Sequence, residues 1–326
     1  GEDATICEGS VHQLAGQATN YASLLWATSG TGTFNDPTIL NPSYTPSAQD
    51  VLQGAVVLSL TASNPSANDS TDYLTLSLRA APVVFAGEAT EICAGGNFSA
   101  GTAYALNYSV IEWVSSGTGV FDDPASVTPR YTPGPEDITT GAVILTLRAW
   151  NDICDPVESV VNISIRPLPL PSISGQNSAC QNQAGAQYLA ASTGNTYEWD
   201  VAGGTITDGQ NSSTATVTWD AAGEGVMMLT EINEFGCSQS TQFPVTVNPL
   251  PTPAIDGNAL VCANSQEVLY TTALVGGDEY EWDVTGGEIV SGAGTNAVTI
   301  NWGGNGQGML SLIQTTSATT CSAPAE

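Results

Sequence analysis

Few side chains in this 326-residue sequence could carry out catalysis. There is a single histidine, His12, and no lysine, and no serine lies in a Gly-x-Ser-x-Gly elbow. Nucleophilic and general-base catalysis of the familiar kinds depend on such residues, so the sequence predicts neither. It also argues against a zinc site, because there is no Cys-x-x-Cys pair and only one histidine.

Paired carboxylates are the remaining catalytic option. Glu198 and Asp200 flank one tryptophan, and Glu281 and Asp283 flank another. Side chains two positions apart on a strand share a face, whereas glycosidases usually oppose two acids across a cleft, from different strands. An earlier copy of the same pattern has no acid at either place. We therefore predict a solvated sheet face and no enzymatic activity.

Acidic turns could bind Ca²⁺ through carboxylate and carbonyl oxygens. The candidates are Asp36, Asp122, Asp123, Glu136 and Asp137. Aspartate before proline also starts turns, and the chain lacks the spacing of an EF-hand. Calcium is the one cofactor that the sequence leaves open, and no other cofactor is expected.

Seven cysteines occur at regular spacing, which suits an oxidising compartment if they pair. We predict three disulfides, each closing a loop of about 60 residues within one repeat: Cys93–Cys154, Cys180–Cys237 and Cys262–Cys321. Cys7 has no partner at the corresponding distance and is predicted to be unpaired. It is either a leftover thiol or one half of a bond to a preceding module or to another chain.

The cysteines belong to a fourfold internal repeat. A tryptophan follows the first cysteine of each copy after 19 or 20 residues, and these four residues are the predicted core markers: Trp26, Trp113, Trp199 and Trp282. The first two copies share Ser-Gly-Thr-Gly-x-Phe-x-Asp-Pro, and the last two share Tyr-Glu-Trp-Asp-Val-x-Gly-Gly. Four modules of two subtypes therefore follow one another.

Apolar residues alternate with polar ones inside each copy, which is typical of half-buried strands. Together with the repeat length, this predicts an all-β chain of four tandem immunoglobulin-like or PKD-like β-sandwiches. Their expected boundaries are 1–85, 86–169, 170–250 and 251–326. Alternating prolines at residues 167–171 and 249–253 predict short, semi-rigid linkers and an elongated row of modules.

The last module is expected to be C-terminally incomplete. After Cys237 the third copy continues through an alternating strand, residues 238–247, whereas only residues 322–326 follow Cys321. A strand missing from a sheet leaves backbone groups unpaired and part of the core open. The missing strand is expected from residues beyond 326 or from a neighbouring chain.

The charge balance narrows the choice of partners. Four arginines against 32 acidic residues give a net charge of −28, so nucleic acid is excluded, because binding it needs clustered cations. Direct membrane insertion is not expected, since no apolar run approaches the roughly 20 residues of a spanning helix. Neighbouring modules of the same chain are the expected partners, with a homo-oligomer or filament, surface glycans and other cells as further alternatives.

Residues 170–326 closely resemble the PKD-like and immunoglobulin-like repeats of very large Bacteroidota surface proteins, and residues 1–169 resemble them more loosely. The motifs that carry the resemblance are Val261–Ala263, Tyr197–Gly204, Tyr280–Gly287, Val217–Trp219, Val298–Trp302, Asn233–Ser238 and the Pro-Leu-Pro linkers. The resemblance implies export by the type IX secretion system. It also implies an extracellular, cell-surface role as a stalk, adhesin or fibre, as in gliding-motility adhesins.

Two functions remain in competition. The first is a structural repeat segment of a long extracellular adhesin or surface fibre that serves as a stalk, in attachment or in motility. The alternative is a set of carbohydrate-binding accessory modules of a secreted enzyme. The exposure of Trp150 distinguishes these two functions, since this tryptophan recurs in no other copy. An exposed, flat Trp150 would favour sugar binding, and a buried one would belong to the core.

Overall fold

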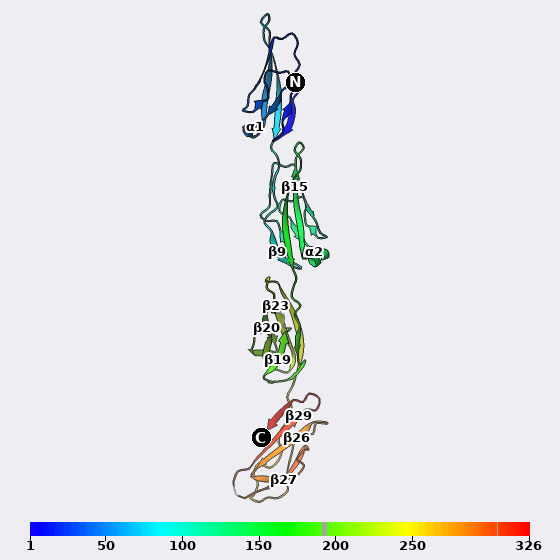
Figure 1. Ribbon diagram of the computed structural model, residues 1–326. Helices are drawn as coiled ribbons and strands as arrows, with labels where there is room; N and C mark the ends of the chain where they lie inside the picture. The colour runs from blue at the N-terminus through cyan, green and yellow to red at the C-terminus, as the bar shows by residue number, and fades with distance from the viewer. Residues whose placement is uncertain (191–193, 305) are drawn as a thin grey trace. The chain divides into compact units, whose positions relative to one another are not determined.

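The chain folds almost entirely into strands. The computed structural model describes residues 1–190, 194–304 and 306–326. It divides into two compact units, Gly1–Pro167 and Leu168–Glu326, and each unit holds two β-sandwich modules (Figure 1). Within the described residues, the helices are α1 (Ala48–Gln53) and α2 (Pro135–Thr140), and none is long and apolar enough to cross a membrane.

Module 1 packs two sheets against each other. The strand order of the larger sheet is β1 (Ala4–Cys7), β7 (Ser70–Arg79), β6 (Ala55–Ser63) and β3 (Ser23–Thr28). The smaller sheet has the order β2 (His12–Gln13), β5 (Ser43–Thr45) and β4 (Thr33–Phe34). The first strand, β1, runs parallel to the last, β7, so that Cys7 lies opposite Arg79. The first cysteine of the module is thereby placed where its last strand ends.

Module 2 repeats this plan. Its larger sheet has the order β12 (Val110–Ser115), β15 (Ala142–Trp150), β16 (Val157–Arg166) and β9 (Thr90–Cys93). Its smaller sheet consists of β10 (Phe98–Ser99), β14 (Arg130–Thr132) and β13 (Val120–Phe121), and β11 (Tyr104–Leu106) pairs with β8 (Val83–Phe85). Again the first strand is parallel to the last, and Cys93 lies opposite Arg166.

Module 3 has two four-stranded sheets. One has the order β18 (Ser178–Cys180), β24 (Ser238–Asn248), β23 (Gly223–Ile232) and β20 (Thr196–Ala202). The other has the order β17 (Ile173–Gly175), β19 (Ala186–Ala190), β22 (Thr214–Trp219) and β21 (Gly204–Asp208). Cys180 lies opposite Asn248 at the end of the last strand.

Module 4 copies module 3 with shorter sheets. Its sheets have the orders β26 (Glu279–Thr285), β29 (Met309–Thr315), β30 (Ser322–Ala325) and β25 (Val268–Thr271), β28 (Ala297–Trp302), β27 (Gly287–Ser291). The segment around Cys262, which corresponds to β18 of module 3, is not a strand here. The first cysteine of this module therefore lacks the parallel pairing that holds its counterparts.

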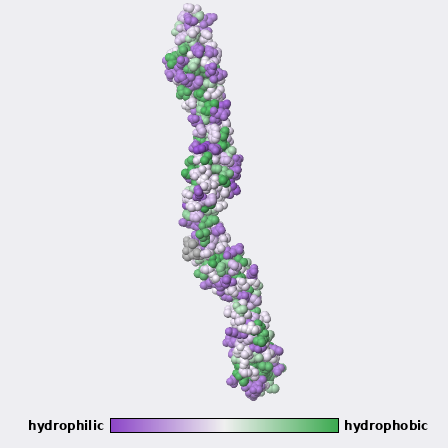
Figure 2. Space-filling model, turned by 90° about the vertical axis from the view of Figure 1, so that its right-hand side faces the viewer, coloured by the Kyte–Doolittle hydropathy of each residue, from purple (hydrophilic) through white to green (hydrophobic). Residues whose placement is uncertain are grey.

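Each module has its own hydrophobic core. The four tryptophans that the repeat marks as core residues are 2–5% exposed: Trp26, Trp113, Trp199 and Trp282. They lie on β3, β12, β20 and β26, and they pack with the alternating apolar residues of the facing sheet. On the face drawn in Figure 2, hydrophilic and hydrophobic residues are interspersed in both units, as expected for a surface rich in Ser, Thr, Asn and Gly.

Candidate functional site at the module junctions

The disulfides join neighbouring modules. Cys7 of module 1 bonds Cys154 of module 2, with Cα atoms 5.1 Å apart, and Cys180 of module 3 bonds Cys321 of module 4, with Cα atoms 5.5 Å apart. All three predicted pairs, Cys93–Cys154, Cys180–Cys237 and Cys262–Cys321, are therefore wrong, and so is the unpaired Cys7. Cys93 and Cys237 are also disulfide-bonded, and the free, exposed cysteine of the described chain is Cys262.

Strand geometry explains why pairing inside a module fails. The first cysteine of module 3, Cys180, lies beside Asn248 at the end of β24, whereas Cys237 directly precedes the start of the same strand. Eleven residues of strand separate these ends, which is about 35 Å, while a disulfide needs Cα atoms within about 7 Å. The two cysteines of one module thus lie at opposite ends and cannot pair with each other.

A local asparagine turn presents the second cysteine of module 2. The Oδ1 atom of Asn151 accepts hydrogen bonds from the backbone amides of Ile153, at 3.1 Å, and Cys154, at 2.7 Å. Such asparagine turns are a common alternative to regular backbone pairing between strands. The turn joins β15 to β16, and it holds Cys154, which is 5% exposed, against the junction with module 1.

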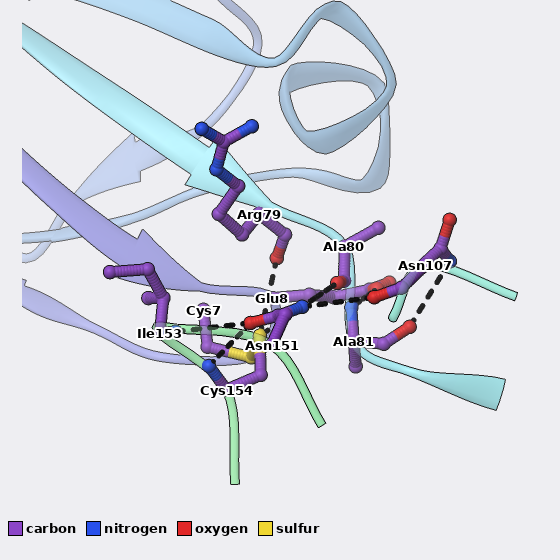
Figure 3. The surroundings of a disulfide bond; sticks show 9 residues. All are labelled: Cys7, Glu8, Arg79, Ala80, Ala81, Asn107, Asn151, Ile153 and Cys154. Atoms are coloured by element: carbon purple, nitrogen blue, oxygen red, sulfur yellow. Dashed lines mark hydrogen bonds between the residues drawn. A yellow bond between two sulfur atoms is a disulfide. The ribbon is translucent and has the colours of Figure 1, made fainter. Parts of the chain in front are cut away.

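The same asparagine also ties down the linker between modules 1 and 2 (Figure 3). Its Nδ2 group donates to the carbonyl oxygens of Ala80, at 3.2 Å, and Asn107, at 3.0 Å. Asn107 in turn donates to the carbonyl of Ala81, whose amide donates to the carboxylate of Glu8. The junction is therefore a covalent bond surrounded by a polar network that fixes the backbone of the linker.

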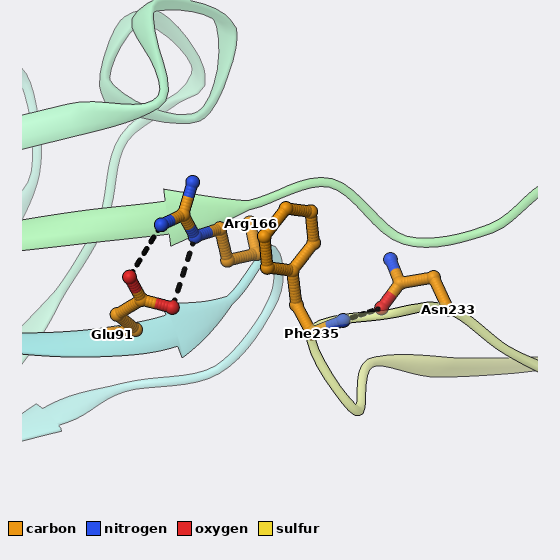
Figure 4. Close-up of polar contacts among 4 residues, drawn as sticks. All are labelled: Glu91, Arg166, Asn233 and Phe235. Atoms are coloured by element: carbon orange, nitrogen blue, oxygen red, sulfur yellow. Dashed lines mark hydrogen bonds and ion pairs between the residues drawn. The ribbon is translucent and has the colours of Figure 1, made fainter.

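Module 3 carries a related turn before Cys237. The Oδ1 atom of Asn233 accepts from the amides of Phe235, at 3.1 Å, and Cys237, at 3.0 Å (Figure 4). At the end of module 2, Arg166 of β16 forms a two-pronged ion pair with Glu91 of β9, which the same figure shows. The asparagine before each of these cysteines is the sequence signal for the turn, although nothing in the sequence indicates that Asn151 also binds the linker between modules 1 and 2.

The calcium candidates lie in separate turns and on α2, and most of them accept hydrogen bonds from the protein itself. Asp36, Asp122 and Asp123 each accept hydrogen bonds from nearby backbone amides in exposed turns, and Glu136 is exposed on α2. Asp137 is 2% exposed and fully surrounded by protein donors. Within the described residues, no three His, Cys, Asp or Glu side chains come together as a metal site.

Asp137 is the centre of a buried network that has a copy in module 1. Its carboxylate accepts from the amides of Thr118, Gly119 and Gly134 at 2.9–3.0 Å and from the Tyr131 hydroxyl at 2.6 Å. In module 1, Asp50 accepts in the same way from Tyr44 and three backbone amides.

Hydrogen bonding decides the charge of these two carboxyls. Burial alone would raise the pKa of Asp137, but the hydrogen bonds from Tyr131 and the backbone outweigh it and hold the pKa below its usual value. The pKa of Asp50 is lowered by the same balance.

The sequence signal for this buried network was Tyr-x₅-Asp, which occurs in both modules. A Cβ atom at Gly117 would lie 1.7 Å from the Asp137 carboxylate, which explains a glycine of the Ser-Gly-Thr-Gly motif.

The remaining candidates lie apart from the junctions. Glu198, Asp200, Glu281 and Asp283 are exposed on β20 and β26, on the solvent face opposite the buried tryptophans. Trp150 is half-buried at the end of β15, opposite Val110, so it is neither a flat exposed platform nor a core residue. His12 is half-buried on β2, and burial lowers its pKa.

Comparison with known proteins finds a family match over the second half of the chain. The family model described as PKD-like domain matches residues 166–247 and 248–326. Among solved structures, the titin fragment I67–I69 is 10% identical over 77% of this chain and 96% of its own, with a TM-score of 0.40. The human desmocollin-1 ectodomain is 11% identical over 99% and 77%, with a TM-score of 0.27.

The insect immune protein hemolin is 14% identical over 99% of this chain and 97% of its own, with a TM-score of 0.30. Among curated proteins, none is similar enough in sequence to count as a match. The sheets form tandem β-sandwich repeats, as the alternation and the repeat predict, and residues 166–326 match the PKD-like family model.

Proposed function

We propose that the chain is a structural, load-bearing segment of a long extracellular adhesin or cell-surface fibre. The observation that carries the proposal is the stagger of the disulfides, since each one closes a loop that spans two modules. A cross-link between modules does little for one core, but it changes how the chain responds when its ends are pulled apart.

The covalent path between the two ends is short. Cys7–Cys154 bypasses residues 8–153, and Cys180–Cys321 bypasses residues 181–320. About 40 residues, 1–7, 154–180 and 321–326, lie outside both loops, and at about 3.5 Å per residue they can extend to about 140 Å. The same chain without disulfides could extend to about 1,100 Å. Tension therefore passes through the disulfides, and most of the chain is kept out of the load path.

The composition and the resemblance to Bacteroidota surface repeats support an extracellular location. Disulfides persist in oxidising compartments, and a net charge of −28 disfavours binding to nucleic acid and to anionic surfaces. The resemblance to Bacteroidota surface repeats adds export by the type IX secretion system to the proposal. In this role the partners are neighbouring modules of the same long chain, and glycans or other cells at its far end. The half-buried Trp150 gives the carbohydrate-binding alternative no support.

Single-molecule force spectroscopy tests the load path. With handles at both ends, the oxidised chain should lengthen by no more than about 140 Å in total, and the reduced chain should lengthen by roughly 1,000 Å as its modules unfold. Cys7→Ser should release about 400 Å or more in the oxidised chain, whereas Cys262→Ser, at the free cysteine, should change nothing. An oxidised chain that unfolds module by module to full length would refute the load-bearing role.

A further inference from the structure

Arg79 ends the last strand of module 1 without an ionic partner, unlike its counterpart in module 2. There, Arg166 at the end of β16 forms the two-pronged ion pair with Glu91. Arg79 occupies the same position in module 1, since each arginine lies opposite the first cysteine of its module. Within the described residues, the Arg79 side chain forms neither an ion pair nor a hydrogen bond. Figure 3 shows its guanidinium extending away from the linker.

A single replacement accounts for the missing partner. Glu91 lies two positions before the first cysteine of module 2, and Thr5 lies two positions before Cys7. The register of the parallel strands is the same in both modules. Side chains two apart on a strand share a face, so Thr5 and Arg79 lie together on the exposed face of the sheet. Module 1 therefore keeps the guanidinium and has a short hydroxyl where module 2 has a carboxylate.

Thr5 and Arg79 line a cleft of about 560 Å³ at the junction of modules 1 and 2. Module 2 contributes Tyr108, whose side chain is 38% exposed, and Ser109. Small-molecule sites in proteins have volumes of about 300–1,000 Å³ and combine an aromatic or apolar surface with a few polar groups. The cleft has this size and this composition.

The junction holds the cleft in shape before any ligand arrives. The bond between Cys7 and Cys154 joins the two modules beside it. The Asn151 side chain binds the carbonyl oxygens of Ala80 and Asn107, and both of these residues line the cleft. A preformed site loses little binding free energy to the ordering of its own backbone.

We propose that this cleft binds the carboxylate of a uronic acid residue in an otherwise neutral glycan. The carboxylate takes the place that Glu91 takes in module 2, and it accepts two parallel hydrogen bonds from Arg79. Arginine is the side chain best suited to this geometry, because its planar fork matches a carboxylate. The apolar face of the sugar ring packs on Tyr108, and the hydroxyls of Thr5 and Ser109 bind its hydroxyl groups.

The charge of the protein limits which acidic ligands fit. A net charge of −28 repels polyanions from the surface, so a glycan with isolated carboxylates is favoured over a highly charged one. Asp152 also lines the cleft and opposes an anion there, and we expect affinity on the order of 1 mM. The proposal is independent of the load-bearing role, because that role concerns the disulfides and would stand if no glycan bound.

Nuclear magnetic resonance of the arginine side chains tests the proposal directly. The chain has four arginines and therefore four Nε–Hε signals, which single substitutions assign. Titration with methyl glucuronide should shift the signal of Arg79 and leave that of Arg166, which already has a carboxylate partner. Arg79→Gln should weaken binding at least about tenfold. Arg130→Gln is the matched control, because it removes an exposed arginine outside the cleft and should leave binding unchanged.

Thr5→Glu restores the carboxylate that module 2 has. In the ligand-free protein it should move the Arg79 signal towards that of Arg166, and it should weaken binding of methyl glucuronide at least about tenfold. Thr5→Gln adds the same length without the charge and should change affinity less than about threefold. Asp152→Asn should tighten binding about twofold, because it removes a like charge. Mass spectrometry of each variant verifies that the bond between Cys7 and Cys154 is intact.

Two further ligands decide what the cleft recognises. Methyl glucoside has the same ring with a hydroxymethyl group in place of the carboxylate, and it should bind at least about tenfold more weakly. Equal binding of the two sugars, or unchanged binding in Arg79→Gln, would overturn the proposal. Glutamate with blocked termini carries one carboxylate and no sugar ring. If it bound as tightly as methyl glucuronide, the assignment to a sugar would be wrong.

Discussion

Modules 1 and 2 solve one packing problem differently from modules 3 and 4. In every module, the sheet that lacks the core tryptophan has an inner strand with a large aromatic residue. This residue is Tyr44 or Tyr131 in the first unit, and Trp219 or Trp302 in the second. We call this sheet the second sheet. A buried aromatic polar group needs a partner, and the two units supply partners of different charge.

The first unit uses a carboxylate. The Tyr131 hydroxyl donates to Asp137, which also gathers the amides of a glycine loop and of the helix start. The second unit uses a neutral ring, since Trp219 Nε1 donates to the Tyr188 hydroxyl at 3.2 Å and Trp302 donates to Tyr270 at 3.1 Å. The same sandwich can therefore be centred on a buried charge or on an aromatic pair.

The core tryptophans add a second difference between the two units. Trp199 and Trp282 donate from Nε1 to backbone carbonyls of Ser212 and Thr295, both at 2.8 Å. In the first unit, the Nε1 groups of Trp26 and Trp113 are buried with no acceptor within the described residues. In the second unit both buried aromatic positions thus have hydrogen-bond partners, whereas in the first unit only the tyrosine of the second sheet has one.

Removing the buried carboxylate should have the largest effect. Asp137→Ala leaves three backbone amides and a tyrosine hydroxyl without their acceptor, which should destabilise module 2 by about 3–5 kcal/mol. Amide exchange measured by mass spectrometry over β14 and α2 would report the loss module by module.

Glu136→Ala is the matched control, because this neighbouring acid is exposed on the same helix. It should cost no more than about 0.5 kcal/mol. If both variants cost the same, Asp137 is not the centre of the first unit, and the contrast between the units disappears.

Truncating the core tryptophans should have the next largest effect on stability, and the loss should differ between the two units. Trp199→Phe loses ring volume and a hydrogen bond to Ser212, which should cost about 2–3 kcal/mol. Trp113→Phe removes ring volume together with an indole N–H that has no acceptor, so it should cost about 1 kcal/mol less. Thermal unfolding of the two variants would measure the difference, and a larger cost for Trp113→Phe would contradict it.

The sequence was sufficient to predict the fold because the fold depends on periodicity. Alternation, the repeat length and the four tryptophans indicate four sandwiches, and Trp26, Trp113, Trp199 and Trp282 are buried. The disulfides were mispredicted, because spacing along the chain does not show at which end of a sandwich a cysteine lies. Cys180 sits on a parallel edge strand, and this pairing places it about 35 Å from Cys237.

The polar network was hidden for a related reason. Asp137 looks like any acid in a turn, and only the fold brings Tyr131 and the Ser-Gly-Thr-Gly loop to it. Its nearest sequence signal, Tyr-x₅-Asp in modules 1 and 2, is readable only when the tyrosine is known to be buried. Contacts that depend on the packing of two sheets are not encoded in local pattern.

Acid should weaken the first unit more than the second. The pKa values of Asp50 and Asp137 lie below their usual value in the folded state, so these carboxyls stabilise the fold above the unfolded pKa of about 3.8. That contribution is lost as the pH falls from about 4 through the folded values. The effect should be smaller than that of Asp137→Ala, because protonation removes the charge and leaves the side chain in place.

Differential scanning calorimetry at pH 6 and pH 3 would measure this difference. The transition that Asp137→Ala shifts should move down further at pH 3 than the transition that Trp199→Phe shifts. In Asp137→Asn, the module 2 transition should depend less on pH. An equal downward shift of both transitions in the unaltered chain would show that the buried carboxyls do not set the acid response.

The two tyrosine hydroxyls give the smallest and most direct comparison. Tyr131→Phe removes a hydrogen bond to an ionised carboxylate, which is worth about 1.5–3 kcal/mol, whereas Tyr188→Phe removes bonds between neutral groups, worth about 1 kcal/mol. Both rings stay in place, so packing is conserved and the difference reports the charge of the partner. Urea unfolding near pH 6 should show the larger loss for Tyr131→Phe, and the difference should shrink as the pH falls through the lowered folded-state pKa of Asp137, because a protonated Asp137 is a weaker acceptor. A difference that stays constant as the pH falls would mean that Tyr131 acts through its packing and that the two units are stabilised in the same way.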